Sequence, residues 1–148
     1  MRKRALLRSR TALPDPPVSE NQMGIEIRNF DCDGELQIVH GYGDGGFRVT
    51  SQSYQGDLLL LPRLTREWRC PDPITLRFAD LEPLLGETPP PLFLLGAGPA
   101  PQQHLPELAA DLKVNGINLE LMSTAAACRT WNVLMSEGRN AAAALIAV

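Results

Sequence analysis

The segment INLELMSTAAACRTWNVLMSEGRNAAAALIAV, residues 117–148, decides the fold because its hydrophobic period changes along its length. INLELM alternates apolar and polar residues, as a half-buried strand does. TAAACRTWNVLMSEG then follows a helical period, capped by Ser123 or Thr124 and ended by Gly138. Periodicity alone does not separate strand from helix in AAAALIAV. We expect a strand there, because it completes the alternation of elements.

The residues just upstream repeat this alternation. LFLLG (92–96) is a short apolar run typical of a buried strand. LPELAADLKVNG (105–116) places its leucines on one helical stripe, with Pro106 in the first turn and Gly116 after the last. The C-terminal half therefore follows the order β-α-β-α-β, which predicts parallel strands joined by right-handed crossovers.

The N-terminal half of the folded part, residues 24–78, is predicted to be rich in strands. LQIVHGYGDGGFRVT (36–50) indicates strand, glycine turn and strand, and DLLLLP (57–62) indicates a strand buried on both faces. EWRC (67–70) and ITLRF (74–78) are shorter strand candidates, and ADLEPLLGETPPP predicts a short helix and a connection. Both halves together predict a single α/β domain over residues 23–148.

Residues 1–22 differ in composition from the rest of the chain. They carry five Lys and Arg and two acidic residues, whereas the following 126 residues carry nine basic and fifteen acidic ones. Prolines at positions 14, 16 and 17 prevent a continuous helix. We expect a disordered basic extension, with a targeting or lipid-touching arm as the alternative. A further hypothesis is that translation naturally starts at Met23.

The composition of the whole chain excludes several classes of function. A net charge of −3 over 148 residues argues against a general nucleic-acid binder. No apolar run approaches the ~18 residues of a membrane span. Three widely spaced cysteines fit a reducing compartment, and the two histidines show no metal-ligand spacing. We expect a cytoplasmic monomer or weak homodimer without metal, cofactor or stable membrane insertion.

Two glycine loops resemble ligand-binding motifs. GYGDGG (41–46) has the spacing G-x-G-x-x-G, but the strand-like FRVT follows it, which favours a hairpin turn over a phosphate loop. GAGPAP (96–101) lies between a predicted strand and a predicted helix. This loop and the helix start at Ser123 and Thr124 should open at the same sheet edge, where backbone amides can hold a small anion. Ordinary helix capping is the alternative.

Cys128 and the polar residues around it offer candidates for chemistry. Cys128 falls on the apolar stripe of its helix, which predicts a buried, unreactive thiol rather than a nucleophile. Arg129, Asn132 and Arg139 lie on a separate face. Glu120, on the polar face of INLELM, could pair with Arg129 or Arg139. It could equally belong to a polar patch that receives a ligand or partner, and both alternatives remain open.

The string M-x-T-x-x-A-x-R-T-x-N-x-L-x-x-E-x-R, from Met122 to Arg139, together with the glycine loop resembles the Mth-type family of domains of unknown function. That family includes archaeal and bacterial proteins, an adipogenesis-associated animal protein and a mitochondrial respiratory complex I assembly factor. Over roughly residues 25–148 the resemblance implies a three-layer α/β fold with a central mixed sheet. It supplies no established catalytic residues.

Two hypotheses of function follow. The first is a non-enzymatic accessory protein with an assembly-factor-like role. Its protein partner is not identified by the residues, and the resemblance implies subunits of a membrane complex, respiratory complex I. Its expected contact surface comprises Tyr42, Asp44, Phe47, Arg129 and Asn132. The second is a binder, or modest enzyme, of a small anion, with Asp44 or Glu120 as the acid or base. Its expected site comprises Gly96, Gly98, Glu120, Ser123, Thr124, Arg129 and Arg139.

Overall fold

The computed structural model describes residues 34–100 and 104–148, within which Leu36–Val148 form one compact unit. The predicted extension 1–22 and the proposed start at Met23 lie outside the described residues. The elements of the N-terminal half are β1 Val39–Gly43, β2 Gly46–Val49, β3 Gln52–Gln55, β4 Leu58–Leu61, β5 Leu64–Glu67 and α1 Phe78–Leu85. Those of the C-terminal half are β6 Leu92–Gly96, α2 Pro106–Val114, β7 Asn118–Met122, α3 Thr124–Ser136 and β8 Ala142–Leu145.

A mixed five-stranded sheet lies at the centre of this unit, in the order β5-β4-β8-β6-β7. β6 pairs in parallel with both β7 and β8, while β4 pairs antiparallel with β5 and β8. The predicted β-α-β-α-β order and its parallel strands are therefore confirmed. β1, β2 and β3 form a separate antiparallel sheet.

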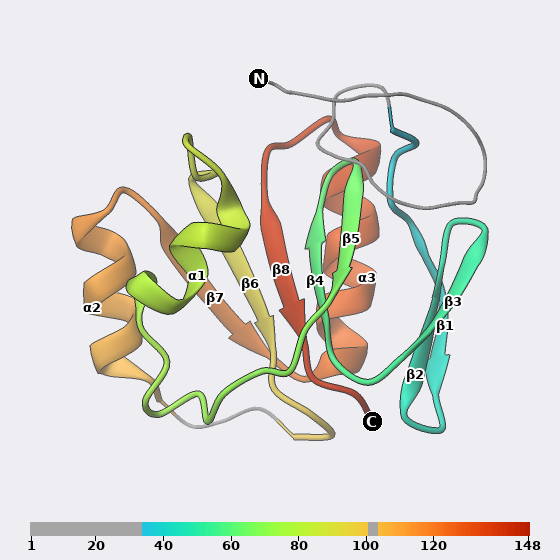
Figure 1. Ribbon diagram of the computed structural model, residues 1–148, viewed down its shortest axis with the longest axis horizontal. Helices are drawn as coiled ribbons and strands as arrows, with labels where there is room; N and C mark the ends of the chain where they lie inside the picture. Colours follow the sequence, from blue (N-terminus) through green and yellow to red (C-terminus); the bar gives the residue numbers. More distant parts are fainter. Residues whose placement is uncertain (1–33, 101–103) are drawn as a thin grey trace. The chain divides into compact units, whose positions relative to one another are not determined.

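Helices and the small sheet cover both faces of the central sheet (Figure 1). Leu59, Phe93 and Leu95 face α1 and α2 on one side. Their neighbours in sequence, among them Leu58 and Leu94, face α3 and the small sheet on the other. Because successive strand residues point to opposite faces, strands that are apolar throughout are required to hold both layers. The structure confirms the expected three-layer α/β architecture.

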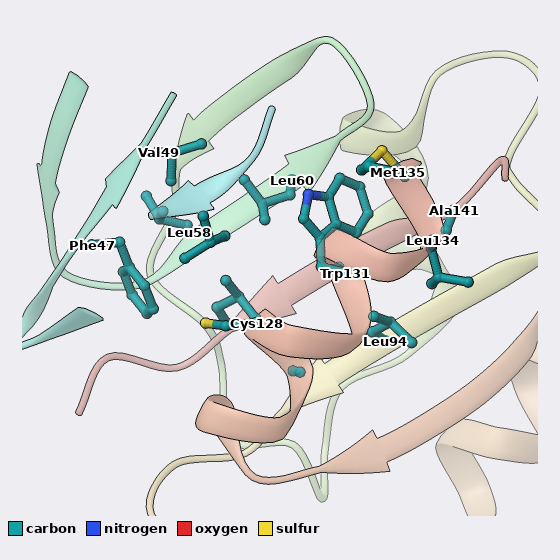
Figure 2. Packing of buried hydrophobic residues seen from close by; sticks show 14 residues of the cluster. Phe47, Val49, Leu58, Leu60, Leu94, Cys128, Trp131, Leu134, Met135 and Ala141 are labelled. Atoms are coloured by element: carbon teal, nitrogen blue, oxygen red, sulfur yellow. The ribbon is translucent and has the colours of Figure 1, made fainter. Parts of the chain in front are cut away.

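Trp131 is the largest side chain of the α3 layer and is completely buried (Figure 2). It packs in one cluster with Cys128 and Met135 of the same helix and with Leu60 of the central sheet. Its indole Nε1–H donates a hydrogen bond of 2.7 Å to the carbonyl oxygen of Gln37. Since a buried indole N–H needs a partner, this bond fixes the chain that leads into β1 against α3.

Two of the weaker strand predictions are wrong. In EWRC only Glu67 belongs to a strand, because the true partner of β4 is the preceding Leu64–Glu67. ITLRF forms a turn and the start of α1, since the amides of Thr75 and Leu76 donate to the Asp72 carbonyl oxygen. The polar strand β3, with the sequence QSYQ, lacks the apolar alternation by which a strand is recognised.

Candidate functional site

The glycine loop GYGDGG is a hairpin between β1 and β2, as the sequence indicated. Gly43 pairs with Gly46, and the two residues between them, Asp44 and Gly45, have φ values of 54° and 77°. Both central residues thus have the positive φ of a type I′ turn, for which Asp-Gly is a preferred pair. At Gly46 an added Cβ would lie 2.5 Å from the Tyr54 carbonyl oxygen, so the strand needs glycine there.

The two loops expected to share a sheet edge do lie together, in a cluster that we call the β6–α3 junction: Gly96, Gly98, Thr124 and Ile146. The Gly98 N–H donates to Thr124 Oγ1 at 2.9 Å, and the Thr124 N–H donates to the Gly98 carbonyl oxygen at 2.9 Å. The Thr124 hydroxyl in turn donates to the Ile146 carbonyl oxygen at 2.7 Å. The Ile146 N–H donates a hydrogen bond to the Gly96 carbonyl oxygen and so completes the junction.

The polar groups of the junction are engaged with one another. Thr124 has no exposed surface, and Gly96 lets α3 approach so closely that an added Cβ would lie 3.0 Å from the Thr124 Cα. Ser123 caps α3, its hydroxyl accepting the Ala126 N–H at 3.2 Å. The amides of Gly98 and Thr124, which were candidates for an anion, therefore already have acceptors. This arrangement corresponds to the capping alternative.

Cys128 is a packing residue, as its place on the helix predicted. Its side chain lies in the α3 cluster and is 3% exposed. Burial raises the pKa of the Cys128 thiol to about 11, and the adjacent Arg129 only partly opposes this shift. Because the thiolate is the nucleophile, a thiol with a raised pKa is poorly reactive at neutral pH.

The polar candidates on β7 and α3 do not form the ion pair considered from the sequence. Arg139 lies 3.8 Å from Glu137, with both side chains more than half exposed. In the part of the chain that the structure describes, neither Glu120 nor Arg129 has an ion-pair partner, and both are exposed. Asn132 instead links α3 to β1. Its side chain accepts a hydrogen bond from the Val39 N–H at 2.9 Å and donates one to the Val39 carbonyl oxygen at 2.8 Å.

The expected contact surface stays a prediction, except that Phe47 is buried and cannot belong to it. Tyr42, Phe47 and Tyr54 are opposite one another on three adjacent strands and so share one face of the small sheet. Phe47 occupies the middle strand of this row and is only 3% exposed, so it belongs to the core and not to a surface. Tyr42, on the edge strand, is 45% exposed. The turn residue Asp44 is also exposed.

Val133 is a surface residue that the sequence analysis did not single out. It is 54% exposed on α3, one turn beyond Arg129, and α3 contacts β1. We define the α3–β1 face as Tyr42, Asp44, Arg129 and Val133. Val133 lies on the same helical face as Arg129, away from the stripe that carries Cys128 and Trp131, so the helical period could have indicated its exposure.

A second feature absent from the sequence analysis is a groove beside β7. It has a volume of about 420 Å³ and is open to solvent. Its lining residues are His104, Leu105, Pro106, Ala109, Leu119 and Leu121. All of these except His104 are apolar, and they come from the start of α2 and from one face of β7. The sequence signal was the alternation of INLELM, which predicted a strand but not its place at a sheet edge.

Residues 34–100 and 104–148 contain neither a metal-ligand cluster nor a membrane-spanning helix. No group of three or more His, Cys, Asp and Glu side chains there is arranged to hold a metal ion. No helix in these ranges combines the length and apolar character needed to span a membrane.

A family model described as a protein of unknown function (DUF498/DUF598) matches residues 39–146, from β1 to just beyond β8. The chain belongs to this DUF498/DUF598 family. The match contains both the hairpin and the β6–α3 junction.

Members and structural neighbours of the DUF498/DUF598 family confirm the Mth-type resemblance. The chain is 39% identical to an uncharacterised protein of Rhodobacter capsulatus, over 73% of this chain and 82% of that protein. It is 32% identical to NADH dehydrogenase [ubiquinone] 1 alpha subcomplex assembly factor 3 of Danio rerio, over 74% of this chain and 63% of that protein. The match thus spans less than two-thirds of the named assembly factor.

A solution structure from Bordetella pertussis, described as a Mth938-like domain, superimposes with a TM-score of 0.64 at 25% identity. The superposition covers 82% of this chain and 92% of that one. The three-layer α/β fold with a mixed central sheet is therefore the fold of this DUF498/DUF598 protein.

Proposed function

We propose that this protein assists the assembly of a complex I-type NADH dehydrogenase by binding a protein subunit, and that it does so without catalysis. The observation that carries the proposal is the 32% identity to a protein named as a complex I assembly factor, over 74% of this chain. The family match, residues 39–146, lies within the compact unit Leu36–Val148. We place this role in the cytoplasm, on subunits that have not yet joined the membrane complex.

The α3–β1 face supports this proposal as the contact surface. It combines a half-exposed aromatic residue, Tyr42, with the exposed guanidinium of Arg129 and the exposed apolar side chain of Val133. Aromatic and arginine side chains are the residue types that most often dominate binding energy at protein interfaces. Asn132 holds α3 to β1, so both parts of the face keep a fixed relation.

The test is deletion of the gene in the native host followed by rescue. We expect deletion to lower the amount of assembled NADH dehydrogenase on native gels, and the wild-type chain to restore it. Arg129→Ala should restore less, whereas Arg48→Ala should restore fully. Arg48 is a matched control, because it is an exposed arginine on β2 whose side chain alternates with those of Phe47 and Val49.

Each result separates two parts of the proposal. If deletion leaves the assembled enzyme unchanged, the assembly role is wrong. If deletion lowers it but Arg129→Ala, Tyr42→Ala and Val133→Asp each restore it fully, the role stands and the contact surface is elsewhere.

A further inference from the structure

The outer edge of β7 has the geometry of a strand-binding site. β7 is the last strand of the central sheet, and within the described residues β6 is its only strand neighbour. The Asn118 N–H donates to the Pro91 carbonyl oxygen, and the Met122 carbonyl oxygen accepts from the Ala97 N–H. In a parallel ladder, alternate residues direct their backbone groups to the same neighbour. The N–H and C=O groups of Leu119 and Leu121 therefore point away from β6.

The side chains of Leu119 and Leu121 extend this open edge into the apolar groove. Both are partly buried, and both pack against the cluster formed by α1 and α2. Beside them the groove is lined by Leu105 and Ala109 of the α2 region. An extended segment paired with β7 would place every second side chain over this groove, because strand side chains alternate between the two faces.

Glu120 sets the charge on the opposite face of the same edge. It lies between Leu119 and Leu121, so its side chain projects to the other side of the sheet, where it is exposed. It has no ion pair among the described residues. A residue directly opposite Glu120 on an added strand is favoured if it is basic and disfavoured if it is acidic.

We propose that the β7 edge binds an extended segment of another protein in which apolar residues alternate with lysine or arginine. The backbone groups of Leu119 and Leu121 hydrogen-bond the segment, as in strand addition to other sheet edges. Its apolar side chains fill the groove, and a basic side chain pairs with Glu120. A second copy of this chain is a poorer occupant, because antiparallel pairing centred on Glu120 sets two carboxylates opposite each other.

This proposal does not rest on the assembly role, and its test uses defined peptides in place of a cellular partner. The probes are two blocked, fluorescent decapeptides, one of alternating Ile and Lys and one of alternating Ile and Glu. We expect the lysine peptide to bind the full chain about fivefold or more tightly than the glutamate peptide, because a favourable cross-strand pair replaces a repulsive one. NMR of the labelled protein should show the Leu119 and Leu121 amides shifting on binding.

Two charge reversals locate the effect. Glu120→Lys should reverse the preference between the peptides. Glu67→Lys makes the same charge change on β5, the opposite edge of the central sheet, and should leave the preference intact. Both residues are exposed, so both variants are expected to fold. A third variant, Leu121→Pro, removes an outward N–H and should weaken the lysine peptide.

Several results would overturn the proposal. These are no binding of either peptide, equal binding of both, or a preference lost equally in Glu120→Lys and Glu67→Lys, which would indicate net charge alone. Concentration-dependent dimerisation that shifts the Leu119 and Leu121 amides would assign the edge to a second copy instead. None of these results bears on whether deletion of the gene impairs assembly, so the two proposals fail separately.

Discussion

The β6–α3 junction and the β7 edge lie on neighbouring strands of one sheet, yet they use their backbone groups in opposite ways. At the junction, the amides of Gly98 and Thr124 each find an acceptor inside the fold, and the Thr124 hydroxyl both accepts and donates. At the edge, Leu119 and Leu121 turn their backbone groups away from the sheet, beside an open apolar groove. The first region is closed by its own hydrogen bonds, whereas the second has no strand partner on its outer side among the described residues.

This difference shows why a motif in the sequence is a poor guide to a site. Glycine followed by a helix start looks like an anion loop, but glycine is equally required where a helix and a strand approach closely. An added Cβ at Gly96 would meet Ala127, Thr124 and Leu145 within 3.1 Å, which explains this glycine by packing. An edge strand has no comparable motif, because its binding capacity lies in the backbone.

Removing the Thr124 hydroxyl should produce the largest loss of stability and so test how closed the junction is. Thr124→Val leaves the Gly98 N–H and the Ile146 carbonyl oxygen without that partner in a buried setting. We expect the free energy of unfolding to fall by about 2–4 kcal/mol, measured by urea denaturation. Thr124→Ser keeps the hydroxyl and should cost about 1 kcal/mol. Equal losses in both variants would show that the hydroxyl is unimportant.

Filling the close approach at Gly96 should give the next largest effect. Gly96→Ala forces the new methyl group against the α3 backbone, which we expect to lower the free energy of unfolding by about 1–3 kcal/mol. Gly41→Ala is the matched control, since nothing lies within 4 Å of the added Cβ. Thermal unfolding of both variants measures the difference. A neutral Gly96→Ala would mean that the junction is loosely packed.

Raising the pH tests the burial of Cys128 on the helix that closes the junction. The folded-state pKa of this thiol is about 11, above its ordinary value of 9.0, so the folded state keeps a proton that the unfolded state loses. Its contribution to stability is therefore present below pH 9 and is lost as the pH rises toward 11. We expect a loss of about 1 kcal/mol at pH 10 relative to pH 8.

The matched variant for this pH dependence is Cys128→Ala, which should lose less stability than the wild type over the same interval. Cys70, whose pKa burial and the acids Asp57 and Asp72 raise to about 12, is present in both proteins and does not affect the comparison. The free energy of unfolding of both proteins is measured by urea denaturation at pH 8 and at pH 10. An equal decrease in the two proteins would contradict a buried Cys128.

A charge reversal at the β7 edge should have the smallest effect on stability. Glu120 is exposed, and Glu120→Lys should change the free energy of unfolding by no more than about 0.5 kcal/mol. Urea denaturation of Glu120→Lys and of Thr124→Val should therefore show the largest difference in unfolding free energy between the two regions. A loss as large as that of Thr124→Val would mean that Glu120 is part of the fold and not of a binding edge.

The order of elements in the C-terminal half was predictable because its period alternates between that of strands and that of helices. The hairpin was predictable too, since Asp44 and Gly45 are residues that accept positive φ. The burial of Phe47 was not, because a residue's place on a middle strand depends on pairing that lies outside local sequence. Likewise, the open edge of β7 follows from the order of the strands in the sheet, and the hydrophobic period of a strand does not indicate that order.

Amide hydrogen exchange, followed residue by residue by NMR, tests the central claim most directly. The claim is that the junction is closed and the β7 edge is open. We expect the amides of Gly98 and Thr124 to be among the slowly exchanging ones, since both donate within the fold. Those of Leu119 and Leu121 should exchange rapidly. Slow exchange of Leu119 and Leu121, matching that of Gly98 and Thr124, would show that the edge is already occupied and would contradict the account.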